Sequence, residues 1–118
     1  KLINMSVQGP PIYLPSQQAT ACALVANELV LNALEHAFHG RDSGTVSLQL
    51  TDKGDQMALV VTDDGIGLPE DAEQLDSLGL TIVRTLVEGD LKGEFTMERA
   101  QPGTRASVTF HKDLSNGT

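Results

Sequence analysis

The sequence predicts an α/β two-layer sandwich, with a mixed, mainly antiparallel sheet of about five strands and helices on one face only. Short segments alternate apolar and polar residues as half-buried strands do, and two longer segments repeat apolar residues at helical spacing. Their order is strand, long helix, two strands, loop, helix and two strands. A chain of 118 residues, 40% hydrophobic and 20% charged, fits one domain with a packed core.

Each predicted element has its own signal in the chain. A loosely apolar strand over residues 2–7 ends at Gly9 and two prolines, and a long apolar helix follows over 16–38. Ser16 is the expected N-cap of that helix and Gly40 its terminator. The other strands are expected at 46–51, 57–62, 94–99 and 105–111, and the second helix at 78–88, ended by Gly89. Residues 1–111 then form the domain, and 112–118 a polar C-terminal tail.

Charge and cysteine content exclude several classes of protein. Sixteen acidic and eight basic residues give a net charge of -8, so we expect neither nucleic-acid binding nor adhesion to an anionic membrane. No apolar stretch reaches the roughly 18 residues of a membrane span, so no direct membrane insertion is expected. The single cysteine, Cys22, is expected to be a small buried hydrophobe, and the lack of a disulfide pair favours a reducing, cytoplasmic location.

Two polar residues interrupt the first helix. Glu28 and Asn32 are four residues apart, so their side chains share a face of an otherwise apolar helix. An unpaired polar group buried there would cost roughly 1–3 kcal/mol. Contacts with a ligand satisfy this requirement, and so do contacts with backbone groups or water.

A glycine-rich acidic segment directly follows the strand over residues 57–62. It reads Asp63-Asp64-Gly65-Ile66-Gly67. An aspartate at the end of a buried strand is placed to accept a hydrogen bond from a ligand amino group, and the two glycines let the backbone approach a flat ring. An ordinary turn is the alternative interpretation.

Two further short motifs lie in the second half of the chain. Gly79 and Leu80 fall in the first turn of the second helix, where backbone N–H groups and the helix dipole suit a phosphate. Taken alone, the motif is explained more simply by an ordinary helix start capped by Asp76 or Ser77. Thr104, after Gly103, either offers its hydroxyl to a ligand or closes a turn.

In this order and spacing, the four motifs resemble the ATP-binding domain shared by sensor histidine kinases and the gyrase and MutL-type ATPases, the GHKL or Bergerat fold. Residues 27–38 resemble the N box, 63–67 and 78–80 the two glycine boxes, and 103–104 the last motif. The resemblance covers nearly the whole chain. It is nearest to histidine kinases whose N box carries Glu, here Glu28, four residues before the metal-binding Asn.

The resemblance implies a role for each motif residue. Asn32 would ligate a Mg²⁺ ion on the ATP phosphates, and Glu28 would orient or deprotonate the acceptor histidine. Asp63 would accept from the adenine amino group. The other implied nucleotide-binding residues are Gly65, Gly67, Gly79, Leu80 and Thr104. Because residues 66–77 contain no Lys or Arg, Arg84 or Arg105 would have to help neutralise the phosphates.

The predicted function is therefore that of the catalytic domain of a two-component sensor histidine kinase. It would transfer the γ-phosphoryl of Mg-ATP to a histidine on separate upstream dimerisation helices, from which a response regulator takes it. The isolated domain is expected to be a monomer. Two alternatives remain open from the sequence: a serine kinase of the anti-sigma type, and a nucleotide-binding regulatory module that transfers no phosphate.

Overall fold

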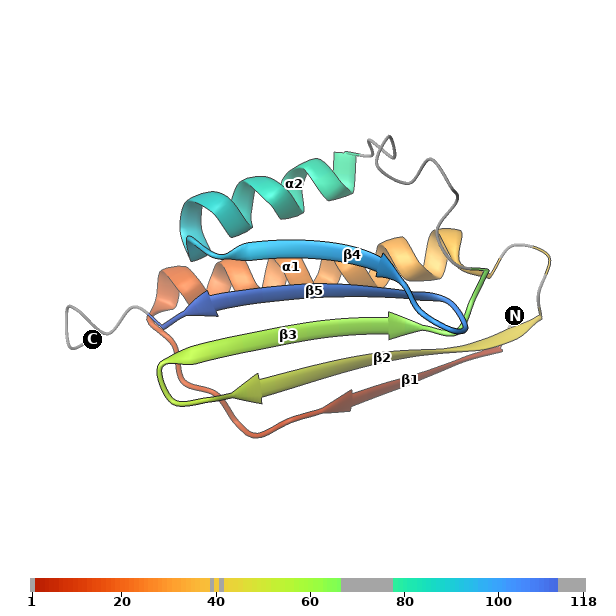
Figure 1. Cartoon of the computed structure of the whole chain (residues 1–118), viewed down its shortest axis with the longest axis horizontal. Coiled ribbons are helices and arrows are strands. Elements are labelled where there is room, and N and C mark those ends of the chain that lie inside the picture. The colour runs from red at the N-terminus through yellow and green to blue at the C-terminus, as the bar shows by residue number, and fades with distance from the viewer. Residues whose placement is uncertain (1, 39, 41, 67–77, 113–118) are drawn as a thin grey trace.

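The computed structural model describes residues 2–38, 40, 42–66 and 78–112 (Figure 1). Its secondary structure follows the predicted order. The elements are β1 (Leu2–Gln8), α1 (Ser16–His36), β2 (Ser43–Asp52), β3 (Gln56–Asp63), α2 (Leu78–Leu86), the π-helical turn η2 (Val87–Leu91), β4 (Glu94–Arg99) and β5 (Thr104–His111).

The five strands form one sheet in the order β1-β2-β3-β5-β4. β1 runs parallel to β2, and every other neighbouring pair is antiparallel. Both helices pack on one face, so the predicted two-layer sandwich with a mixed, mainly antiparallel sheet is confirmed (Figure 1). β3 lies in the middle of the sheet, as its apolar residues on both faces predicted.

The core lies between the sheet and the two helices. α1 contributes a stripe of buried residues at helical spacing, which includes Ala21, Val25 and Leu29. β3 and β5 bury every second residue against it. From α2 and η2 come Leu80, Val83, Val87 and Leu91. Each fully buried large side chain stabilises the fold by about 1.5–3 kcal/mol, and together they fix both helices on the sheet.

The ends of α1 differ from the prediction. Ser16 is the first helical residue, and the N-cap is Pro15, which has no side-chain capping bond. The proline ring fixes φ at Pro15, at −54°, which restricts the backbone ahead of the first turn, but it offers no acceptor to the first helical N–H groups. The helix ends at His36, two residues before the predicted end at Phe38. Phe38 instead packs on β2, and its ring fills the space that a side chain at Gly44 would occupy. The C-cap is Ala37, so Gly40, which has a φ of +74°, lies beyond the end of the helix and is not its terminator.

The second helix does not end at Gly89. It continues through η2, and the left-handed residue Lys92, with a φ of 51°, ends it. Leu91 is only 2% exposed and lies one turn beyond the buried Val87. Burying this additional leucine explains why the helical path passes through the glycine.

Candidate functional site

Two strands and two helices each have one of their ends at the same end of the sandwich. β3 ends and β5 begins there, and α1 ends and α2 begins at the same end (Figure 1). Asp63 and Thr104 are directly opposite each other in the β3–β5 ladder. They are 5% and 8% exposed, so they are polar groups buried on the helix face of the sheet. This end therefore brings together Asp63 and Thr104, two residues that the resemblance implies bind the nucleotide.

Two hydrogen bonds hold the segment after Asp63 in place. Oδ1 of Asp63 accepts the Gly65 N–H at 2.9 Å, and the Ile66 N–H donates to the Ala37 carbonyl, also at 2.9 Å. A Cβ on Gly65 would lie 2.2 Å from that carbonyl oxygen. Glycine is thus required at this position by the end of α1, a reason that the sequence did not reveal. Gly67 lies outside the described residues.

Glu28 and Asn32 are on α1, at the edge of its buried stripe. Both are half-buried. Among the described residues neither side chain has a hydrogen-bond partner, and water reaches both, so the desolvation cost expected for full burial is avoided. An amide oxygen at Asn32 and a carboxylate at Glu28 are therefore available to a ligand.

Gly79 and Leu80 lie in the first turn of α2, as predicted. The Leu80 side chain is 3% exposed and belongs to the hydrophobic core, so only its backbone faces the helix N-terminus. The expected caps, Asp76 and Ser77, lie outside the described residues.

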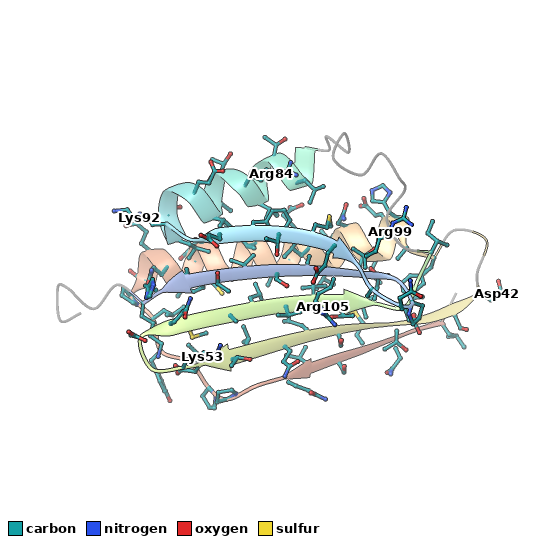
Figure 2. The ribbon with its side chains drawn as sticks, viewed as in Figure 1. Asp42, Lys53, Arg84, Lys92, Arg99 and Arg105 are labelled. Atoms are coloured by element: carbon teal, nitrogen blue, oxygen red, sulfur yellow. The ribbon has the colours of Figure 1, made fainter. Side chains whose placement is uncertain are left out.

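The two arginines expected to neutralise phosphates are engaged elsewhere. The Arg84 guanidinium lies 5.8 Å from the centre of the Phe95 ring, a cation–π contact between α2 and β4. Arg105 is 3.6 Å from Glu98, and since its neighbours Thr104 and Ala106 are buried under the helices, it projects from the opposite face of the sheet. Both residues are labelled in Figure 2.

A hollow of about 630 Å³ lies at the same end of the sheet. Arg105, Ser47 and Thr62 line it, together with Thr45, Asp63, Asp64 and the turn formed by Ala100, Gln101 and Pro102. Neither Asn32 nor Thr104 is part of this lining. The hollow thus shares Asp63 with the helix-side meeting of α1, β3 and β5 but reaches neither of these two residues.

The sequence placed Gly103 and Asp64 in motifs but did not reveal how each of them shapes this end. Gly103 has a φ of +90°, and a Cβ there would lie only 1.8 Å from the Asp63 carbonyl oxygen. Asp64, a member of the acidic motif, accepts the Thr45 N–H at its Oδ1, at 2.8 Å. A signal existed for Gly103, because a glycine before a buried strand often marks close backbone approach. None existed for the pairing of Asp64 with Thr45.

A two-layer sandwich with a buried aspartate and two helix ends at one end of the sheet is the arrangement expected from the resemblance to ATP-binding domains. The family model for histidine kinase-, DNA gyrase B-, and HSP90-like ATPases matches residues 17–116. Sensor histidine kinase PdtaS of Mycobacterium tuberculosis is 45% identical over 91 residues, which are 75% of this chain and 18% of that protein. Blue-light-activated histidine kinase 2 of Erythrobacter litoralis is 38% identical over 109 residues, 90% of this chain and 31% of that protein.

Solved structures agree with these sequence matches. The histidine kinase domain of the Erythrobacter litoralis EL346 blue-light activated kinase superposes with a TM-score of 0.87 at 35% identity, over 98% of this chain and 54% of that one. The chain belongs to the histidine kinase-, DNA gyrase B- and HSP90-like ATPase family, and the ATP-binding ATPase domain expected from the sequence is confirmed at that level. It spans less than a third of the length of the curated relatives named above.

No helix among the described residues is both long and apolar enough to cross a membrane.

Proposed function

We propose that this chain is the catalytic domain of a cytoplasmic two-component sensor histidine kinase, of the subclass with Glu in the N box. It transfers the γ-phosphoryl of Mg-ATP to a histidine on separate upstream dimerisation helices, and a response regulator then receives the phosphoryl group. The observation that carries the proposal is the buried Asp63–Thr104 pair, placed where α1 ends and α2 begins. The family match and the sensor histidine kinases among the relatives favour this function over the serine kinase.

Adenine recognition is assigned to the buried pair. A carboxylate at Asp63 accepts from the exocyclic amino group, and the Thr104 hydroxyl lies across the ladder from it. Because Oδ1 of Asp63 already accepts the Gly65 N–H, the carboxylate is held in one orientation. Gly65 and Gly67 belong to the same base-binding segment.

Phosphate binding is assigned to the start of α2. Gly79 and Leu80 lie in its first turn, where the dipole favours negative charge. Neither Arg84 nor Arg105 is directed to this point, so little of the neutralisation comes from arginine. That places a greater share on the helix N-terminus and on a divalent cation.

The residues present fit a magnesium ion. Mg²⁺ prefers oxygen ligands and usually takes only one or two from the protein, and the half-buried Asn32 amide has no protein partner among the described residues. When bound, the ion neutralises charge on the phosphates. Glu28, one turn earlier on α1, orients the acceptor imidazole or accepts its proton.

Glu28→Gln separates binding from transfer. The substitution keeps the shape of the side chain and removes its basicity, so we expect phosphorylation of the acceptor helices by radiolabelled ATP to fall by about 10²–10⁴-fold. ATP affinity should stay within about twofold, since Glu28 is not assigned to the nucleotide. If the variant phosphorylated the acceptor helices as fast as wild type, Glu28 would have no catalytic role.

Asn32→Ala tests the metal. Wild-type ATP binding should strengthen when magnesium is added, and the variant should lose that dependence. Unchanged magnesium dependence would assign the ion to other ligands. A wild-type chain that binds no ATP at all would overturn the proposed function.

A further inference from the structure

The path of the chain out of β3 depends on one unusual hydrogen bond. The β2–β3 ladder runs in antiparallel register to the pair Val46 and Asp63. One step further, the same register places Thr45 opposite Asp64. The Asp64 N–H does donate to the Thr45 carbonyl, at 3.2 Å, as a ladder continuing in this register requires.

The second hydrogen bond between Thr45 and Asp64 has a different acceptor from the one in a regular ladder. In a regular ladder the Thr45 N–H would donate to the Asp64 backbone carbonyl. Here it donates to the Asp64 side chain, at 2.8 Å to Oδ1. The carboxylate has replaced the backbone carbonyl as the acceptor, so the Thr45 N–H, on a half-buried residue, keeps a partner after the chain has left the sheet.

This replacement lets the chain leave the sheet at once. Directly after Asp64, Gly65 lies against the end of α1 and the Ile66 N–H bonds to Ala37. If Asp64 used its own carbonyl in the ladder, the strand would continue straight and the turn toward α1 would come later. The position of Gly65 in turn fixes Asp63, because its N–H bonds to the Asp63 carboxylate.

We propose that Asp64 is a positioning residue for nucleotide binding: its carboxylate completes the last rung of the β2–β3 ladder and thereby orients Asp63 and Gly65 toward the base. The role rests on the proposed function, since it acts on the residues assigned there to adenine. Asp64 itself need not touch the nucleotide.

Two variants separate this role from a purely structural one. Asp64→Asn keeps an oxygen that accepts from Thr45, and we expect its ATP affinity to stay within about threefold of wild type. Asp64→Ala removes the acceptor and should weaken ATP binding about ten- to a hundredfold, as small displacements of binding groups do. Asp52→Ala is the matched control, because Asp52 bonds to a backbone N–H at the opposite end of the same hairpin and should leave ATP affinity unchanged.

The experiment measures ATP affinity of the 118-residue chain by calorimetry and the exchange rate of the Thr45 amide proton by NMR without nucleotide. We expect fast Thr45 exchange in Asp64→Ala only, together with its loss of affinity. Slow exchange in Asp64→Ala, or an affinity loss no greater than that of Asp52→Ala, would overturn the positioning role. Absence of ATP binding by the wild-type chain would overturn the proposed function instead, while the exchange result would still report on the hydrogen bond.

Discussion

The two ends of the β2–β3 hairpin carry the same local motif in opposite surroundings. At one end Asp52 accepts the Gly54 N–H, and at the other Asp63 accepts the Gly65 N–H, both at 2.9 Å over two residues. Asp52 is exposed and pairs with the ammonium of Lys112 at 2.9 Å. Asp63 is 5% exposed and lies across the ladder from a buried threonine.

Local sequence therefore does not separate a structural turn from a candidate binding site. Both segments have the pattern Asp-x-Gly, and in both the glycine N–H donates to the aspartate two residues before it. The difference comes from what packs around them: the end of α1 meets Gly65, whereas a Cβ on Gly54 would meet nothing within 4 Å. A buried carboxylate at a junction of four elements is suited to a ligand, and an exposed one beside a lysine is suited to closing a hairpin.

The largest expected difference between the two turns is in ATP affinity. Asp63→Asn replaces one carboxylate oxygen by an N–H donor that would face the donor amino group of adenine, so we expect ATP binding to weaken about a hundredfold. Asp52→Asn should change it by less than about twofold, because that turn lies at the other end of the sheet. Calorimetric titration of both variants with ATP measures this difference in affinity. Equal losses of affinity would mean that the Asp63 turn is no more involved in ATP binding than the Asp52 turn.

A second difference is expected in stability. Gly54 and Gly103 have nearly equal φ values, +92° and +90°, but only Gly103 has atoms in the way of a Cβ, the nearest at 1.8 Å. Alanine at Gly54 carries backbone strain alone, whereas alanine at Gly103 carries strain and a clash. We expect Gly103→Ala to lower the free energy of unfolding by about 1–3 kcal/mol more than Gly54→Ala.

Urea unfolding of both glycine variants at neutral pH measures that difference. Equal losses would mean that the backbone near Asp63 shifts freely to admit a methyl group. Asp63 would then be held less firmly than its burial implies.

The smallest effect is a pH dependence confined to the exposed turn. The hydrogen bond from Lys112, followed by the Gly54 N–H, lowers the pKa of the Asp52 carboxyl. A folded-state pKa below the unfolded value, about 3.9, stabilises the protein above that pH, and this stabilisation is lost as the pH falls through the folded-state pKa. Wild type should therefore exceed Asp52→Asn in stability at pH 7, with the difference shrinking below about pH 4.

Thermal unfolding of the two proteins between pH 7 and pH 3 follows this difference. A gap that stays constant over the range would show that Lys112 does not act on the charge of Asp52.

The sequence predicted most of the fold because its signals were periodic. Alternation placed β4 at its observed bounds, and the stripe through Ala21, Val25 and Leu29 predicted the buried face of α1. The helix ends were harder, since burial of Leu91 carries the chain past Gly89, a residue that ends many helices. Tertiary packing decided those ends, and no local signal records it.

The candidate site divides in the same way. The Asp63–Thr104 pairing follows from two strands that were both predicted from the sequence, so their meeting was within reach. The directions of the Arg84 and Arg105 side chains could not be predicted in this way. That of Arg84 depends on the Phe95 ring of β4, and that of Arg105 on which face of β5 the helices cover. The role of Asp64 could not be predicted either, because its side chain replaces its own backbone carbonyl as a hydrogen-bond acceptor, and no spacing rule describes such a replacement.

Binding of ATP at the end of the sheet that bears Asp63 can be observed residue by residue in solution by NMR. In a titration of the 118-residue chain with Mg-ATP, the backbone amides of Asp63, Gly65, Leu80 and Thr104 should shift, and those of Lys53 and Gly54 should not. Shifts confined to the Asp52 turn, or no shifts at millimolar ATP, would mean that ATP does not bind at the Asp63 end of the sheet.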